Sequence, residues 1–187
     1  MNAIRPNPLA ETSRHFLSRY EGLAARLAMP DARNDAVAAF RASGLPTPRE
    51  ESWHYTSLRP LAGVTFFEPL VPVGQSAEIS GRLPALEAPR LVFVDGRFDH
   101  GLSVLPEAVH VRIGWPEIGM LARPDGDRLV ALNGMLCEDG AVIEVPAETD
   151  GGTLVLANLG TDVHGRPISY HPRHALRLGM AAGVDDS

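Results

Sequence analysis

The chain has 187 residues, 44% of them hydrophobic and 21% charged, with a net charge of −6. This composition is ordinary for one globular domain or two small ones. The basic residues form no stripe and the overall balance is acidic, which argues against a nucleic-acid-binding surface. A single cysteine excludes an internal disulfide and is typical of a reducing compartment. No apolar run is long enough to cross a membrane, so we expect a cytoplasmic protein.

The amino-terminal stretch predicts two amphipathic helices that form a hairpin. Asn7-Pro8 is typical of a helix start, and apolar residues recur at helical spacing over 16–27. Pro30 should end this helix, and Asp31 is a candidate cap for the second one. Gly44 suits the left-handed position that closes a helix in a Schellman motif.

The densest group of aromatic, proline and charged residues is Leu45–Leu61, with the sequence LPTPREESWHYTSLRPL. Prolines fix φ and disfavour helix before them, so this stretch predicts a shaped connector rather than a continuous helix. We expect Trp53 and Tyr55 to bury their rings and clamp the helical hairpin onto the strands that follow. A contact with a ligand or a partner is the alternative. The predicted structural clasp comprises Arg49, Glu51, Trp53 and Tyr55.

The middle of the chain predicts a loop-rich linker over Glu68–Pro89 and then a β-hairpin. Asp95-Gly96 lies between two apolar runs and is a strong type I′ turn signal. We expect the clasp to pack against this hairpin. Val109–Ile113 predicts a further strand, and Trp115–Leu121 a helical turn. Either Asp125 or Asp127 should cap a short helix that continues to Leu136.

From Asp139 onward the chain predicts short strands. Ala141–Val145, Thr153–Leu159 and Ala175–Leu178 are rich in β-forming residues and are separated by glycines. Such spacing suits either the coils of a β-helix or a small sandwich, and the pattern does not separate the two.

Four segments in order resemble the SufD family of the SufBCD iron–sulfur cluster assembly system. PREESWHYTSLRPL resembles its RxExWxYTxL signature, and Leu91–Phe98 (LVFVDGRF) resembles a strand–turn–strand segment of that family. Ala131–Pro146 (ALNGMLCEDGAVIEVP) and Ser169–Leu178 (SYHPRHALRL) resemble two later segments. The resemblance extends from Leu45 to about Leu178, which is most of the chain.

The resemblance implies an α+β fold, with an amino-terminal helical hairpin and mixed region (1–138) followed by a β-helix core and acidic tail (139–187). Only the first one or two coils of a right-handed parallel β-helix fit, so we expect a truncated homologue. The resemblance also implies a non-enzymatic scaffold with SufB-like and SufC-like partners. It implies that this portion binds no cofactor, while the whole complex handles an iron–sulfur cluster. A β-helix needs several stacked coils, so we expect an apolar open edge that favours self-association. The edge comprises Leu154, Leu156, Leu176 and Leu178.

The alternative is a small stand-alone metal-binding protein or enzyme. Its candidate ligands, Cys137, His164, His171 and His174, are the ligand types that iron or zinc prefers. However, the cysteine has no CxxC partner and the last two histidines flank a Pro-Arg pair, so we expect no metal site. No phosphate-binding loop or nucleophile elbow is present either, and we therefore expect no catalytic residues.

Overall fold

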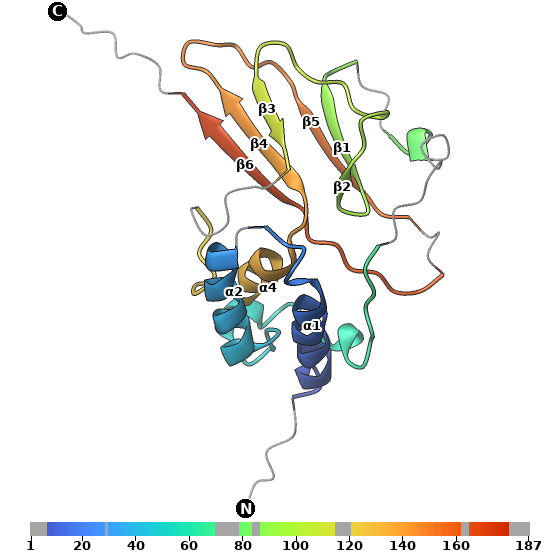
Figure 1. Cartoon of the computed structure of the whole chain (residues 1–187), viewed down its shortest axis with the longest axis vertical. Helices are drawn as coiled ribbons and strands as arrows, with labels where there is room; N and C mark the ends of the chain where they lie inside the picture. The colour runs from blue at the N-terminus through green and yellow to red at the C-terminus, as the bar shows by residue number, and fades with distance from the viewer. Residues whose placement is uncertain are drawn as a thin grey trace, which may run out of the picture. The chain divides into compact units, whose positions relative to one another are not determined.

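The computed structural model describes residues 7–28, 30–69, 79–83, 87–114, 121–161 and 165–179. The fold is mixed α+β, as predicted (Figure 1). The chain divides into two compact units whose segments interleave along the sequence. Unit 1 comprises 1–68, 118–136 and 166–169, and unit 2 comprises 69–117, 137–165 and 170–187. The boundary predicted between residues 138 and 139 stays a prediction.

Unit 1 contains three α-helices in its described residues: α1 (Ala10–Leu23), α2 (Pro30–Ser43) and α4 (Arg128–Leu136). Their apolar faces form one core, as the helical spacing predicted. At its centre Phe16 stacks on Phe66 with 5.6 Å between ring centroids, and meets Phe40 edge-on at 6.5 Å. Rings packed in these geometries stabilise a core beyond their buried area. No helix in the described ranges is long and apolar enough to cross a membrane.

The helix ends follow local sequence signals, with corrections. Helix α1 begins at Ala10 with Leu9 as its N-cap, so the start predicted at Asn7-Pro8 is two residues too early. Asn7 Oδ1 instead accepts a hydrogen bond from Leu9 N at 2.9 Å in the turn that precedes the helix. Helix α2 begins at Pro30, so Asp31 lies in its first turn and the prediction that it caps the helix is wrong. Pro30 fits this place because the first helical position needs no N–H donor.

Gly44 ends α2 with φ of +63°, the left-handed conformation predicted from the sequence. Its N–H donates to Phe40 O at 2.7 Å. The next N–H, that of Leu45, donates instead to Ser13 Oγ at 2.9 Å. A Schellman motif requires this second N–H to bond within the helix, so the predicted motif is wrong and the simpler αL cap is present. Ser13 of α1 accepts the hydrogen bond that a carbonyl of α2 would accept in a Schellman motif.

Unit 2 contains two small mixed sheets, each of three strands in the described residues. One has the order β2-β1-β5 and the other the order β3-β4-β6 (Figure 1). Neither sheet closes into a barrel within those residues. The strands are β1 (Arg90–Val94), β2 (Arg97–Phe98), β3 (His110–Ile113), β4 (Gly140–Val145), β5 (Val155–Leu159) and β6 (Arg173–Leu178).

The hairpin of β1 and β2 turns at Asp95 and Gly96, whose φ angles are +48° and +81°. Two consecutive positive φ values define the type I′ turn, so this prediction is confirmed. The strands predicted near Val109 and after Asp139 are also present. The helical turn predicted for Trp115–Leu121 and much of the linker predicted for Glu68–Pro89 lie outside the described residues.

The last three strands alternate between the two sheets of unit 2. The chain runs through β4 in one sheet, β5 in the other, and then β6, which returns to the first sheet. Each return is parallel: Gly140 of β4 aligns with Arg173 of β6, and Leu91 of β1 aligns with Leu156 of β5. Paired residues on neighbouring parallel strands point to the same face of the sheet. His174 and Leu176 of β6 therefore lie on the inner face, beside Ala141 and Ile143 of β4.

Candidate functional site

The connector 45–61 contains two short 3-10 turns, at Glu51–Trp53 and Arg59–Leu61, and no continuous helix, as predicted. Its aromatic residues do not behave as predicted. Tyr55 is 97% exposed, so its ring clamps nothing, and that prediction is wrong. Trp53 is half-buried, while Arg49 and Glu51 are exposed. The ring of Tyr55 instead meets His54 edge-on, with 4.8 Å between centroids.

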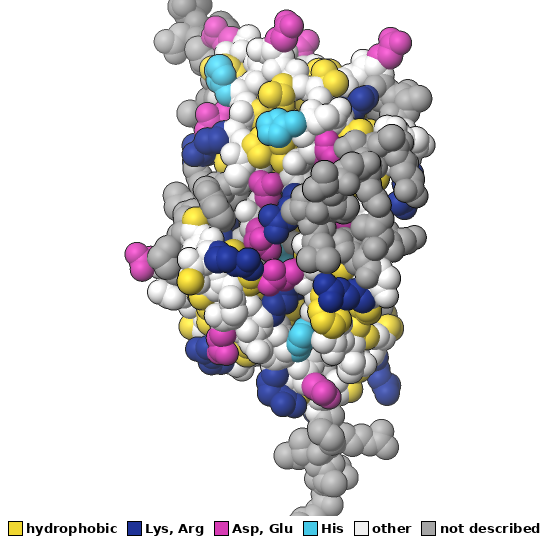
Figure 2. Space-filling view, turned by 45° about the vertical axis from the view of Figure 1, so that its right-hand side comes forward, with side chains coloured by type: hydrophobic (Ala, Val, Ile, Leu, Met, Phe, Trp, Pro, Cys, Tyr) yellow, Lys and Arg dark blue, Asp and Glu magenta, His cyan; other side chains and the backbone are white. Residues whose placement is uncertain are grey.

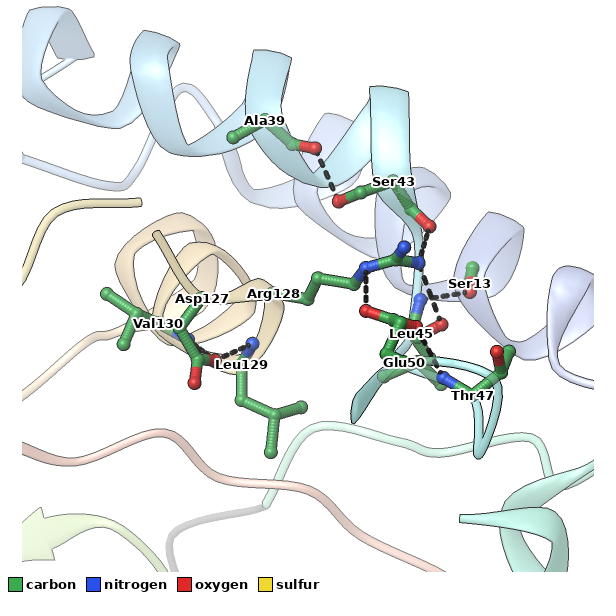
Figure 3. A network of polar contacts seen from close by, with 10 residues as sticks. All are labelled: Ser13, Ala39, Ser43, Leu45, Thr47, Glu50, Asp127, Arg128, Leu129 and Val130. Atoms are coloured by element: carbon green, nitrogen blue, oxygen red, sulfur yellow. Dashed lines mark hydrogen bonds and ion pairs between the residues drawn. The ribbon is translucent and has the colours of Figure 1, made fainter. Parts of the chain in front are cut away.

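A polar network, rather than aromatic rings, fixes the base of this connector (Figure 3). Arg128 Nε lies 2.8 Å from Glu50 Oε2, and Glu50 Oε1 accepts a hydrogen bond from Thr47 N at 2.7 Å. The same guanidinium donates through Nη1 to the carbonyl oxygens of Ser43 and Leu45. Arg128 therefore joins the end of α2, the connector and the start of α4 through one planar group with several donors.

A second arginine binds the other end of α4. Arg33 is only 1% exposed, and its Nη1 donates to the carbonyl oxygens of Gly134 and Met135 at 3.1 and 3.2 Å. Its Nε donates to Ala28 O at 2.6 Å. The last carbonyls of a helix lack partners within the helix, and a cation there also complements the helix dipole. Arg33 thus satisfies the buried carboxyl end of α4.

Neither arginine was predicted from the sequence, although both leave a signal there. Arg33 lies three, four and seven residues before Ala36, Val37 and Phe40, so it belongs to the apolar stripe of α2. Arg128 is the first residue of α4, where a positive charge is unfavourable for the helix dipole unless it is paired elsewhere. An arginine in either position indicates a specific buried or half-buried partner.

The candidate metal ligands are not brought together in the described residues. Cys137 is buried and its Sγ lies 3.5 Å from Asp139 O, while His174 is in β6. His171 precedes β6 and is partly buried. His164 lies outside the described residues. Among the described histidines, cysteines and acidic residues, no three form a group able to hold a metal ion.

His174 lies between the two sheets of unit 2. Its ring meets Phe93 of β1 edge-on at 4.6 Å, and its Nε2 is 3.3 Å from Asn158 Oδ1 of β5. Within the described residues its buried Nδ1 has no hydrogen-bond partner. Burial lowers the pKa of His174, and the negative charge of Asp139 offsets part of that effect. The lowered pKa favours the neutral ring, which lies beside Asn158 in a largely apolar layer.

Tyr170 covers the turn of the β1–β2 hairpin. A Cβ placed on Gly96 would lie 2.6 Å from Tyr170 Cβ, so only glycine fits beneath the side chain. Beside it the buried Asp95 carboxylate accepts hydrogen bonds from Thr161 N at 2.8 Å and Thr161 Oγ1 at 2.5 Å. Burial, and secondarily the charge of Asp95, raises the pKa of Tyr170. This cluster holds the hairpin tip against the segment that follows β5.

The apolar layer between the two sheets ends in exposed leucines. Leu156 of β5 is 39% exposed, and Leu176 and Leu178 of β6 are 58% and 69% exposed. Leu156 aligns with the buried Leu91, and Leu176 with the buried Ile143, so both leucines share the inner face. Both β5 and β6 are outermost strands in the described sheets. The predicted apolar edge is present at these three leucines, whereas Leu154 packs partly against the core.

Basic and acidic side chains are interspersed on the face drawn in Figure 2, and no patch of one sign dominates its described residues.

A scan of models of known protein families finds none that matches this chain, and a search of curated proteins finds no match. The resemblance to SufD therefore stays a prediction that rests on the four motifs.

Proposed function

We propose that this chain is a non-catalytic scaffold of the SufD type, acting in iron–sulfur cluster assembly with SufB-like and SufC-like subunits. The observation that carries the proposal is the path of β4, β5 and β6. Each strand leaves its sheet, crosses to the other, and the third returns parallel to the first. The first coil of a right-handed parallel β-helix would follow such a path, so it supports the fold that the resemblance implies.

The positions of the four motifs support the same proposal. LVFVDGRF forms β1, the type I′ turn and β2, and the segment at Ala131–Pro146 forms α4 and β4. Ser169–Leu178 leads into β6. The PREESWHYTSLRPL segment forms the connector with its exposed Tyr55. Three of the four motifs thus contribute strands to the two sheets of unit 2, and the fourth presents an exposed ring.

An assembly role calls for binding surfaces and a rigid framework rather than a reactive centre. The described residues provide both: a connector fixed by Arg128 and Glu50 that presents Tyr55, and two sheets with open outer strands. Aromatic residues held on a rigid segment lose little entropy on binding and are enriched among energetically dominant contacts.

The test is co-purification of this chain with SufB and SufC homologues from one expression host. A complex with SufB that survives size-exclusion chromatography supports the proposal, and Tyr55→Ala should weaken it. A chain that elutes alone, at every subunit ratio tried, contradicts it. Leu121→Ala is a matched control, because Leu121 is another exposed hydrophobic residue of unit 1, at 73% exposure.

The second candidate function is a metal-binding protein or enzyme that uses His164, His171 and His174. The observation that favours it is the buried Nδ1 of His174, which has no partner among the described residues. Metal content measured after purification without chelators tests it. Stoichiometric iron or zinc that is lost in a His171→Ala/His174→Ala double variant supports this candidate, and a metal-free protein contradicts it.

A further inference from the structure

Three loops lie together at one end of unit 2, the upper end in Figure 1. Arg90, the first residue of β1, pairs with Val155 of β5 on one side and with Val104 on the other. A Cβ on Gly151 would lie 3.6 Å from Val109 Cγ2, so the loop between β4 and β5 contacts the residue that precedes β3. This end, called the loop end below, comprises residues 87–89, 104–109 and 146–154.

The loop end has an exposed apolar centre. Val104 and Leu105 are 50% and 54% exposed, although Leu102 before them and Val109 after them are buried. The backbone of Val104 is fixed as well, because its N–H donates to Arg90 O at 2.8 Å and its carbonyl oxygen accepts from Arg90 N at 2.7 Å. Apolar side chains on an ordered backbone can be covered by a partner with little loss of backbone entropy.

Carboxylates surround this centre, and the three loops contain no basic residue. Nearby, Arg90 Nε donates to Leu102 O at 2.9 Å, and Arg177 of β6 is paired with Glu144. The exposed carboxylates of the loop end belong to Glu87, Glu107, Glu148 and Asp150. Among the described residues none of these four forms an ion pair. Their charges therefore add to a negative potential around the apolar centre.

The carboxylates are dispersed and do not converge on one point. No three acidic, histidine or cysteine side chains in the described ranges form a group able to hold a metal ion. In the paired strands, Val104 and Val155 are separated by two strand spacings, or about 10 Å. An α-helix with its side chains is about 10–12 Å wide. The loop end therefore matches one helix whose positive charges are spread along both flanks.

We propose that the loop end is a docking surface for a basic amphipathic helix of a partner protein. Apolar residues of the helix pack on Val104 and Leu105, and lysine or arginine side chains on its flanks pair with the surrounding carboxylates. Charge complementarity selects this occupant, because a nucleic acid, an anionic lipid surface or an acidic helix is repelled there. The inference does not depend on the proposed role in cluster assembly.

Glu148 carries a second signal at this surface. Its φ is +59°, in the left-handed region where a side chain other than Asn or Asp is costly. Glycine fits that backbone better, so the glutamate provides its carboxylate at a cost in local conformational energy. Glu148→Gly therefore removes a charge from the loop end without removing a stabilising contact, which separates binding from folding.

Fluorescence anisotropy tests the proposal with a labelled amphipathic peptide of leucine and lysine, about 18 residues long, titrated with the full chain. We expect it to bind at least about tenfold more tightly than a peptide of the same composition whose residue order is not amphipathic. The triple variant Glu107→Gln/Glu148→Gly/Asp150→Ser should weaken binding at least about tenfold in Kd. Serine keeps a side-chain oxygen for the bond that Gly152 N donates to Asp150 Oδ1 at 2.9 Å.

The matched control separates docking from the general attraction of an acidic chain for a basic peptide. It removes three exposed carboxylates of unit 1, in the variant Glu11→Gln/Asp35→Asn/Glu51→Gln. The net charge changes by the same amount, so we expect less than about a twofold change in Kd. Equal weakening by the two triple variants, equal binding of the two peptides, or no binding of either peptide would overturn the proposal.

The apolar centre is tested by Val104→Ser/Leu105→Ser, which should also weaken binding at least about tenfold. Leu176→Ser/Leu178→Ser is its control, since these leucines of unit 2 are 58% and 69% exposed but lie outside the loop end, and it should leave Kd nearly unchanged. Hydrogen exchange of the wild-type chain with bound peptide locates the site without any variant. Protection should appear in 104–109 and 146–154, and protection confined to other segments would overturn the proposal.

Discussion

Arg128 Nε lies 2.8 Å from Glu50 Oε2, and this ion pair connects α4 to the proline-rich connector. Both side chains are about 30% exposed, and each makes further hydrogen bonds to backbone groups. An ion pair fixed in this way should contribute more to the free energy of unfolding than an isolated surface pair. The entropic cost of ordering its two side chains is shared with their other hydrogen bonds.

We therefore predict a coupling free energy of about 1 kcal/mol between Arg128→Ala and Glu50→Ala in a double-mutant cycle measured by urea unfolding. The pair Arg177–Glu144 is the control, since both of its side chains are more exposed, at 47% and 45%. Its coupling should be close to zero. Equal coupling in the two cycles would mean that the connector network has no special role in stability.

Arg33 should be one of the most sensitive positions in unit 1. Arg33→Ala removes the donors that satisfy Gly134 O and Met135 O in a buried site. Hydrogen bonds to a charged group in such a place contribute about 1.5–3 kcal/mol, so we expect a loss of stability of that size. Arg41→Ala, at an exposed residue of the same helix, should cost less than about 0.5 kcal/mol. Chemical denaturation of both variants checks this.

Alanine substitutions at two glycines test steric exclusion and backbone strain separately. A Cβ on Gly140 would lie 1.6 Å from Arg173 O, so Gly140→Ala should push β4 and β6 apart and cost about 3 kcal/mol. Gly63 has φ of +74° and open space around it, so Gly63→Ala should cost about 1–2 kcal/mol from strain alone.

Hydrogen exchange distinguishes these two effects. The amides of β6 should exchange faster in Gly140→Ala, because the parallel pairing of Gly140 with Arg173 begins that part of the sheet. The amides of β6 should be unchanged in Gly63→Ala. Unchanged exchange in both variants would show that the two strands tolerate a methyl group between them.

His174 should make the stability of unit 2 fall in mild acid. Its pKa is lowered below the ordinary value of 6.5 by burial, so the unfolded chain binds the proton more readily than the folded one. The stability that this group contributes is present above pH 6.5 and is lost as the pH falls towards the pKa of the folded state. Melting temperatures should therefore decrease less between pH 7.5 and 5 in His174→Leu than in the wild type. An identical dependence in His174→Leu and the wild type would show that this histidine does not couple folding to protonation.

Tyr55 should be dispensable for stability. At 97% exposure its ring buries almost no apolar area, so Tyr55→Ala should change the free energy of unfolding by less than about 0.5 kcal/mol. Trp53→Ala should cost more, because the indole is half-buried. Thermal unfolding of the two variants checks this. A large loss on changing Tyr55 would restore the structural role first predicted for it.

Local signals in the sequence predicted much of the fold. Gly44, Asp127 and the Asp95-Gly96 turn each act through their own backbone or their nearest neighbours, and all three occupy the predicted positions. A helix cap or a type I′ turn is decided within a few residues, so the sequence determines it almost alone.

The features that sequence reasoning missed depend on distant residues. The partners of Arg33 and Arg128 lie on other elements, and the exposure of Tyr55 depends on which elements cover the connector. An aromatic residue between prolines is compatible with burial or with display, and the local sequence is the same in both cases. The parallel pairing of β1 with β5 likewise has no local signal, since more than fifty residues separate them.

The interleaving of the two units has a consequence for synthesis on the ribosome. The β1–β2 hairpin gains its third strand only when β5 appears, and Phe67 pairs with Ile168 in unit 1. An isolated two-stranded hairpin is marginal in water. The core residues of unit 1 all precede Cys137, whereas the sheets of unit 2 stay incomplete until β5 and β6 have been made. A nascent chain stalled before Val155 therefore presents an unfinished unit 2 to the chaperones that attend translation.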